Sequence, residues 1–317
     1  MPDDRLFAAD YLTGDAFTVC RTAEGWWKTT PQPSDMARYY PPVYYGERPR
    51  RFPAPVEWLQ NWLYSRRVRV VSRAVGRAGR VLDVGCGPGH LLARFQREGW
   101  SCIGTEIAAG AASIPRERYG LDVREGNVET LALPEASFDA VVSWHTLEHM
   151  NDPSAVLDEI ARLLTTGGVA LISVPNFSSR EAQARPSAWF HLDIPRHLCH
   201  FPAPVLRAQL ERRGLTVERE SYSAPEYDSF SRVQTWQNRM GLPHNLLFLT
   251  LKGAPPAAGT KSTAAERMTA VLLAAVMLPV AIVVTAWAAW NRTGAVVTFL
   301  ARKTRAPEAG RAIAEGR

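Results

Sequence analysis

The fold is decided by the stretch "VLDVGCGPGHLL", Val81 to Leu92. An apolar run typical of a buried strand leads to glycines at alternate positions, and a helical pattern begins directly after them. Such glycines let the backbone turn sharply and let a ligand touch the main chain. The dinucleotide pattern G-x-G-x-x-G fails because its sixth position, counted from Gly85, is His90, and no G-K-[ST] follows. The turn therefore predicts a ligand-binding loop that is not of the NAD or P-loop type.

Strand and helix patterns alternate on both sides of this loop. Apolar runs predict four buried strands, "RVLDVG", "SCIGTEI", "FDAVVSW" and "VALISVP". Helices are predicted over residues 56–75, in "HLLARFQREG" and in "PSAVLDEIARLLTTGG". The last of these is expected to begin at the cap Asp152 and to end at Gly167–Gly168. Two later strands are "LTVERESYS" and "AVVTFLAR". This alternation predicts an α/β fold with a doubly wound, mainly parallel sheet.

An acidic residue, Asp83, precedes the glycines, and this arrangement resembles motif I of the class I S-adenosylmethionine-dependent methyltransferases. The resemblance covers about residues 80–223 and implies a seven-stranded Rossmann-like sheet whose last strand is antiparallel. It implies S-adenosylmethionine as the cofactor, with Asp83 anchoring the network around the amino group. The loop residues that would support the methionine end are Gly85, Cys86, Gly87 and Gly89.

The second strand and the segment after it extend the expected cofactor site. Glu106 ends "CIGTE", where a carboxylate can accept hydrogen bonds from both ribose hydroxyls, and Ile107 follows it. Asn127 and Val128 stand where the family has its adenine loop, and Asn127 can face the adenine amino group through its carbonyl oxygen. His145, after "FDAVVSW", is expected to line the same pocket.

Histidines supply the expected chemistry. Methyl transfer is an in-line displacement that needs positioning and, for a hydroxyl acceptor, a base. The candidates are His145, His197 and His200, because an ordinary imidazole pKa of about 6.5 suits neutral pH. "WHTLEHM" and "HLDIPRHLCHF" resemble the subgroup of quinone O-methyltransferases and methyltransferases of bacterial polysaccharide clusters.

Some quinone methyltransferases hold a divalent metal near the equivalent of Glu148–His149. Here His149 is expected to pack and hydrogen-bond locally. Relatives of this subgroup also carry a cysteine knuckle near the N-terminus, but Arg21 and Glu24 stand at about its cysteine positions. No metal site is therefore predicted.

The segment "MTAVLLAAVMLPVAIVVTAWAAW", Met268 to Trp290, carries no charge. Its 23 residues would extend about 34 Å as a helix, against a hydrocarbon core of about 30 Å. The strand at Ala295–Arg302 must return to the sheet, and basic residues stand on both flanks, so both ends are expected on one side. Because Pro279 should bend or break the helix, we expect a bent, re-entrant or membrane-lying insertion, paired with Leu242–Gly253.

The chain divides into five expected parts. They are a covering segment (1–55), an S-adenosylmethionine-binding Rossmann-like domain (56–224), an apolar, membrane-associated helical insertion (225–292), the last strand (293–305) and a disordered tail (306–317). The covering segment reads as irregular but ordered, because it is rich in tyrosine and proline.

We expect the catalytic body to lie in the cytoplasm. The four cysteines form no CxxC pair, and the first residues lack the basic start and apolar run that are expected of a signal peptide. The net charge is +6, but no dense Lys/Arg run indicates nucleic acid, so the basic surface is assigned to the inner leaflet.

The sequence thus predicts O-methylation of a membrane-associated acceptor: a lipid-linked sugar, an isoprenoid quinone precursor or another lipid head group. Two alternatives stay open. One is a soluble methyltransferase acting on a small molecule or sugar nucleotide, with the apolar helix serving for dimerisation. The other is a non-catalytic S-adenosylmethionine-binding module. The oligomeric state and the acceptor atom are left open.

Overall fold

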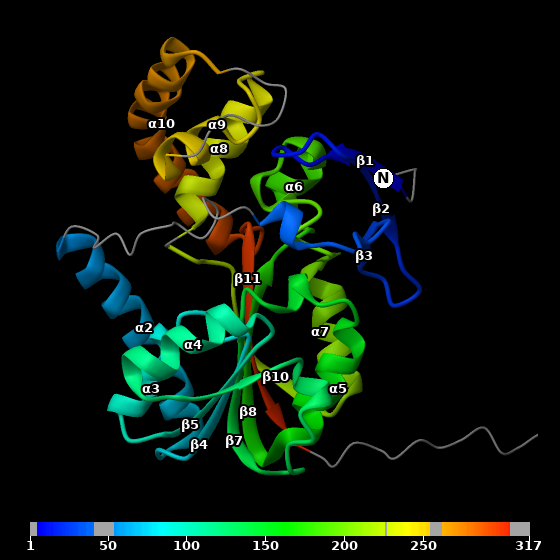
Figure 1. Ribbon diagram of the computed structural model, residues 1–317, viewed down its shortest axis with the longest axis vertical. Helices are drawn as coiled ribbons and strands as arrows, with labels where there is room; N and C mark the ends of the chain where they lie inside the picture. The colour runs from blue at the N-terminus through cyan, green and yellow to red at the C-terminus, as the bar shows by residue number, and fades with distance from the viewer. Residues whose placement is uncertain (1–4, 41–53, 226, 254–261, 305–317) are drawn as a thin grey trace, which may run out of the picture.

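A seven-stranded sheet forms the centre of the protein (Figure 1). The computed structural model describes residues 5–40, 54–225, 227–253 and 262–304. In spatial order the strands are β10 (Leu215–Ser221), β11 (Val296–Lys303), β8 (Leu164–Pro175), β7 (Phe138–Trp144), β4 (Arg80–Val84), β5 (Ser101–Glu106) and β6 (Asp122–Glu125). Only β11 runs antiparallel to its neighbours in this sheet. The expected mainly parallel sheet with an antiparallel last strand is confirmed.

Helices cover both faces of the sheet, as a doubly wound fold requires (Figure 1). One face carries α2 (Ala54–Val75), α3 (His90–Arg97) and α4 (Ala109–Tyr119). The other carries α5 (Pro153–Leu163) and α7 (Ala203–Arg212). Neighbours in one strand enter different cores, since Val81 packs under the first set and Leu82 under the second. This alternation follows from the two-residue period of a strand.

One boundary differs from the expectation. Asp152 caps α5 by accepting a hydrogen bond from the Ala155 N–H, as predicted, but α5 ends at Leu163 rather than at Gly167–Gly168. Leu164 already pairs with Phe138 of β7, so the residues between belong to the long strand β8. Pairing with β7 gives backbone N–H and C=O groups of this segment hydrogen-bond partners in the sheet, so another helical turn is not needed to satisfy them.

The N-terminal segment is a small antiparallel sheet, not the irregular structure expected. It contains β1 (Arg5–Ala9), β2 (Ala16–Arg21), β3 (Trp27–Thr30) and the later two-residue strand β9 (Cys199–His200). The apolar side chains of this small sheet pack against those of the segment that follows β8. That segment holds the short helices α6 (Arg180–Ala184), η4 (Pro186–Ala188) and η5 (Phe190–Leu192). The sheet is followed by η1 (Ala37–Tyr39), and the rest of the tyrosine-rich stretch, 41–53, lies outside the described residues.

The insertion is a helical unit that projects from one end of the sheet domain (Figure 1). It consists of α8 (Asp228–Arg239), α9 (Leu246–Lys252) and α10 (Ala264–Trp290). These helices share a small core, so the expected pairing of the apolar segment with 242–253 is observed. The helix α10 runs unbroken through Pro279 and begins with a capping box between Thr263 and Glu266.

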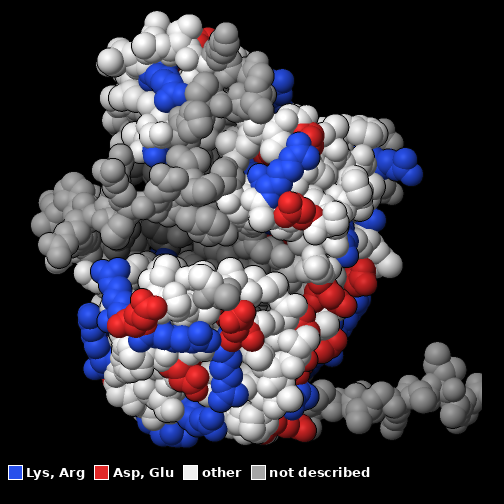
Figure 2. Space-filling model, in the orientation of Figure 1, with Lys and Arg blue, Asp and Glu red and all other residues white. Residues whose placement is uncertain are grey.

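Most of α10 is exposed. It is long and apolar enough to cross a membrane by length and composition, and only 17% of its most apolar window is buried. Val276 is 75% exposed and Trp290 88%. Figure 2 shows this end of the molecule with few charged side chains, whereas the sheet domain carries both signs. An ordinary core helix would be mostly buried, so that explanation of the apolar stretch does not hold for this chain.

Two basic residues that follow α10 in the sequence, Arg302 and Lys303, do not lie at the end of this helix. Lys303 is buried and donates to the Leu164 carbonyl, and Arg302 pairs with Glu218 across β10 and β11. Both belong to the sheet because they lie in β11. Arg292 does lie directly after the end of α10, where a basic flank was expected, and it pairs with Glu220.

Candidate functional site

The glycine loop connects β4 to α3 and has the backbone that its sequence predicts. Gly85, Gly87 and Gly89 all have positive φ, at 68°, 50° and 76°. A side chain at Gly85 would meet Thr146 at 2.3 Å, and one at Gly89 would meet Pro115 at 2.5 Å. Gly87 faces open space within 4 Å, so its backbone is accessible to a ligand. Cys86 contributes only main chain, because its side chain is buried in the core.

Glu106 lies at the end of β5 and holds three main-chain N–H groups. One carboxylate oxygen accepts from Gly87 at 3.0 Å, and the other accepts from Ile107 at 3.0 Å and Ala108 at 3.3 Å. The carboxylate is thus fixed beside the glycine loop. Its hydrogen-bonding capacity suits a pair of ribose hydroxyls.

The residues expected at adenine lie next along the same edge. Gly126 N–H donates to the Glu106 carbonyl at 3.0 Å, which fixes the turn that carries Asn127 and Val128 into η2 (Val128–Thr130). Val128 is buried, whereas Ile107 is 67% exposed. An exposed apolar side chain beside a carboxylate is suited to covering an aromatic base.

Asp83 is the buried carboxyl group beneath the loop. Burial, reinforced by the charge of Glu106, raises the pKa of Asp83 to about 7, and the positive charge of Arg67 on α2 opposes that rise. Such a group needs a cation to stay ionised at lower pH. The ammonium of S-adenosylmethionine would be such a cation.

His145 and Glu148 form a carboxylate–imidazole pair after β7. Nδ1 of His145 lies 3.1 Å from Oε1 of Glu148. Because a carboxylate only accepts, Nδ1 carries the hydrogen and Nε2 keeps its lone pair. That Nε2 has no hydrogen-bond partner among the described residues. The backbone at His145 has a positive φ of 52°, a strained conformation that is common at functional sites.

Glu148 stays ionised although it is fully buried. Burial pushes the pKa of Glu148 upward, but the hydrogen bond from His145 and the nearby imidazoles of His149 and His197 bring it down to about 2. The carboxylate can therefore orient His145 and stabilise the imidazolium that forms when His145 takes a proton.

Three groups of this cluster lie close enough to hold a metal ion. Donor atoms of Glu148, His149 and His197 lie within 4.8 Å of one another. Nδ1 of His149 donates to the Arg196 carbonyl, and Nδ1 of His197 donates to the His191 carbonyl, both at 2.8 Å. Each Nε2 thus keeps a lone pair, as in metal-bound imidazoles. The prediction of no metal is untested, and elemental analysis of the purified protein would test it.

His200 has a different setting from the other candidate bases. It is buried in the small sheet, and its Nε2 lies 3.0 Å from the Thr29 hydroxyl. Burial, with the charge of His197, lowers the pKa of His200 to about 3. Its catalytic role stays a prediction, and its surroundings favour a structural role.

Three residues at the site were not expected from the sequence. The Arg67 guanidinium lies 3.8 Å from the ring centroid of Trp144, and the Tyr227 ring lies 4.9 Å from that of His145. Tyr64 of α2 contacts the ring of His90, which follows the loop. Helical periodicity located α2 but gave no signal of which of its side chains reach the cleft.

The fold and the loop together define the class of protein, a Rossmann-like α/β domain whose glycine loop and strand-end carboxylate fit S-adenosylmethionine. The family described as "Methyltransferase domain" matches residues 57–220, just over half of the chain. The chain belongs to this family of S-adenosylmethionine-dependent methyltransferases, and S-adenosylmethionine is its cofactor.

Curated relatives agree on the class. A protein named a probable S-adenosylmethionine-dependent methyltransferase from Mycolicibacterium smegmatis is 38% identical over 165 residues, covering 50% of this chain and 61% of that protein. A ubiquinone biosynthesis O-methyltransferase from Xanthomonas oryzae pv. oryzae is 39% identical over 196 residues, covering 56% and 76%. The chain thus spans less than two thirds of the first of these relatives and about three quarters of the second.

A solved structure shares the fold. It is the crystal structure of a candidate sarcosine dimethylglycine methyltransferase from Galdieria sulphuraria, with a TM-score of 0.53, 17% identity, and coverage of 86% of this chain and 99% of that chain. At this identity the likeness concerns the fold alone.

Proposed function

We propose that this protein transfers the methyl group of S-adenosylmethionine to an oxygen atom of an acceptor held in the membrane. The observation that carries this proposal is the exposed apolar helix α10, which connects directly to β11 of the cofactor-binding sheet. An exposed apolar surface of this length is stable in lipid and unfavourable in water. The relatives named for O-methylation support oxygen as the acceptor atom.

Different residues bind the cofactor and accept the proton in the proposed reaction. The bound cofactor supplies an electrophilic methyl group on a sulfonium. Gly87 supports its methionine end, Glu106 holds its ribose and Asp83 its ammonium, so that the methyl group is positioned for in-line attack. Nε2 of His145 takes the proton of the acceptor hydroxyl while the oxygen bonds to the methyl carbon, and the electron pair of the breaking bond goes to sulfur.

His197 is the second candidate base, because it packs against His149 with ring centroids 4.8 Å apart in the same cluster. If the protein binds a divalent ion, Glu148, His149 and His197 would hold it, and its chemistry would be that of a Lewis acid. We place the enzyme on the cytoplasmic face of the cell membrane. Both ends of the helical unit return to one sheet, since Ser221 and Thr298 are neighbours across β10 and β11.

The test uses S-adenosylmethionine carrying a deuterated methyl group. The purified protein is incubated with native lipid extract and, separately, with the water-soluble extract, and products are analysed by mass spectrometry. The proposal predicts label in the lipid fraction that requires His145. A label found only in water-soluble products would contradict it and favour the soluble alternative. No transfer at all, with the cofactor still bound, would favour a non-catalytic binding module.

A further inference from the structure

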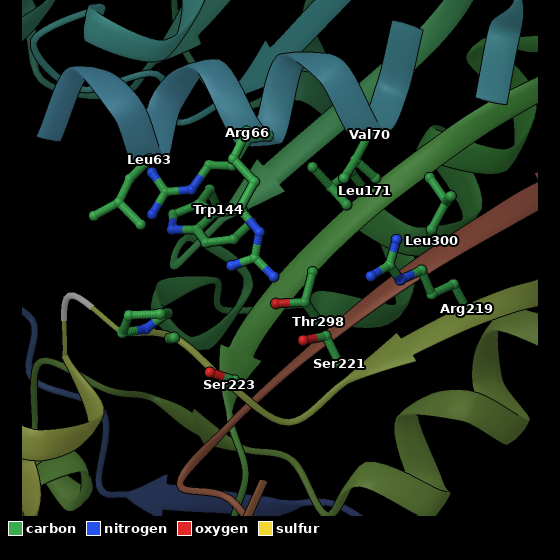
Figure 3. A pocket seen from close by; sticks show the side chains of 13 residues that line it. Leu63, Arg66, Val70, Trp144, Leu171, Arg219, Ser221, Ser223, Thr298 and Leu300 are labelled. Carbon is green, nitrogen blue, oxygen red and sulfur yellow. The ribbon is translucent and has the colours of Figure 1, made fainter. Parts of the chain in front are cut away.

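A pocket lies between α2 and β10 (Figure 3). We name it the α2–β10 pocket and define it by Arg66, Arg67, Arg219, Ser221, Ser223 and Thr298. Its empty space of about 560 Å³ includes open solvent.

The polar lining of the pocket is cationic. Arg66 reaches in from α2 and Arg219 from β10, on opposite sides of the pocket (Figure 3). Of the described residues that line it, none is acidic. Arg66 and Arg219 make no ion pair within the described part of the chain. Guanidinium groups gathered without carboxylates repel one another unless an anion joins them.

The nearby carboxylates are engaged elsewhere. Glu218 pairs with Arg302, and Glu220 pairs with Arg207 and Arg292. The register of β10 shifts between Val217 and Arg219, and regular alternation resumes after the shift, so Glu220 projects from the other face of the strand than Arg219. Arg219 therefore lines the pocket, whereas neither Glu218 nor Glu220 does.

Neutral donors complete the polar side. The hydroxyls of Ser221, Ser223 and Thr298 lie on the strand side (Figure 3). The indole N–H of Trp144, which also lines the pocket, has no hydrogen-bond partner among the described residues. Arginine forks with hydroxyl and N–H donors suit the oxygens of a phosphate. Leu63 and Leu171 provide an apolar wall for the rest of a ligand.

The pocket stands at the root of the helical unit. Ser223 lies on the segment that leads into α8, and Thr298 lies in β11 just after α10. The exposed Trp287 and Trp290 are at this end of α10, and indoles prefer the level of the lipid head groups. If α10 enters lipid, the pocket lies at the depth of the lipid phosphates.

The pocket also adjoins the reacting groups. Arg67 is stacked on Trp144, whose ring contacts His145 with centroids 6.0 Å apart. Burial lowers the pKa of Arg67 to about 10, so that its guanidinium remains charged at neutral pH. A molecule held here by a phosphate would therefore extend toward the base.

We propose that the α2–β10 pocket binds the phosphate of a membrane lipid, and that the methyl acceptor is such a phosphate-bearing lipid rather than a quinone precursor. The identity of the lipid as acceptor rests on the proposed function, whereas the anion site does not. Free phosphate shares the same chemistry, and the test separates the two sources.

Calorimetry with three soluble probes tests the pocket: dihexanoyl phosphatidic acid, dihexanoyl glycerol and inorganic phosphate. Wild-type protein should bind the phosphatidic acid. The double variant Arg66→Gln/Arg219→Gln should bind it at least about tenfold more weakly, because two charge-assisted contacts are lost. Arg69→Gln/Arg73→Gln, which removes two exposed arginines of the same helix, should stay within about twofold. Dihexanoyl glycerol, which has no phosphate, should not bind.

Equally weakened binding of phosphatidic acid in both double variants would overturn the assignment of this pocket, because the general positive charge of α2 would then explain the binding. Inorganic phosphate that binds as tightly as the lipid would overturn the lipid assignment. S-adenosylmethionine affinity should be unchanged in all variants, which shows that they are folded. Should Arg66→Gln/Arg219→Gln not fold, Arg66→Lys/Arg219→Lys keeps the charge and should still weaken binding through loss of the forked geometry.

The two proposals fail separately. Phosphatidic acid binding that depends on Arg66 and Arg219, with no label transferred to lipid, would end the proposed function and leave the pocket intact. Transfer of label to a phosphate-free lipid would end the assignment of a phosphate-bearing acceptor and leave the proposed function and the anion site intact.

Discussion

Asp83 couples cofactor binding to pH. Its pKa is raised to about 7, chiefly by burial, so below that pH the carboxyl group is protonated in the ligand-free protein. Only the carboxylate attracts an ammonium, and binding below pH 7 must release this proton. S-adenosylmethionine should therefore bind roughly tenfold more tightly at pH 7 than at about pH 5.5. Asp83→Asn should bind weakly at both values, and a wild-type affinity independent of pH would refute this role.

His145 is the residue on which the proposed chemistry depends. Replacing it with alanine should lower kcat by roughly 10² to 10⁴, the usual contribution of a general base. The cofactor dissociation constant should change only a few-fold, because the loop and Glu106 are untouched. His244→Gln, a histidine that stacks on Tyr11 away from this pair, is the control and should keep its activity. Equal losses in both variants would remove His145 from the mechanism.

For single residues, the sequence predicted the positions of those that are set by the local course of the backbone. The glycines and Glu106 were placed correctly at one edge of the sheet because strand ends in a parallel sheet meet there. Arg67 and Tyr227 were missed because they arrive from α2 and from the insertion. Their approach depends on tertiary packing, which periodicity does not encode.

Arg196 ties the small N-terminal sheet to the segment after β8. Its guanidinium pairs with Asp10 at 2.7 Å and with Asp193 at 2.8 Å, and it is fully buried. Arg196→Met should lower the free energy of unfolding by about 3–5 kcal/mol, because two carboxylates lose their buried partner. Urea denaturation would measure this. The control Arg212→Met, at the exposed end of α7, should lower the free energy of unfolding by much less. If Arg196→Met left the free energy of unfolding unchanged, these ion pairs would not be what holds the small sheet in place.

Elements of the Rossmann-like domain were predicted well because long apolar runs alternate with helical patterns. The N-terminal strands were not, because they are short and one partner, β9, has only two residues and lies far along the chain. Pairing between distant segments leaves little trace in local sequence.

For the whole molecule, the exposed face of α10 should decide where the protein resides. Leu272→Gln, Val276→Gln and Val283→Gln together should move it from floating with liposomes to the soluble fraction, since all three side chains are exposed and apolar. Phe7→Gln with Ile114→Gln changes two exposed apolar residues outside the insertion and should leave flotation unchanged. Wild-type protein that never floats, and forms a dimer lost in the triple variant, would support dimerisation instead.

The overall arrangement was predictable up to the insertion. The return of the chain from α10 to an antiparallel strand followed from the resemblance, and the structure has it. The α2–β10 pocket was not predictable, because its arginines come from elements about 150 residues apart in sequence.

Calorimetric titration of S-adenosylmethionine into wild-type protein, Glu106→Ala and Glu125→Ala tests the cofactor site most directly. Glu125 lies beside Glu106 on β6 and is exposed, so it is the matched control. Wild-type and Glu125→Ala proteins should bind alike, and Glu106→Ala should bind about 10- to 100-fold more weakly, because hydrogen bonds to a charged group are lost. Absence of binding by the wild type, or equal affinity in all three, would contradict the site.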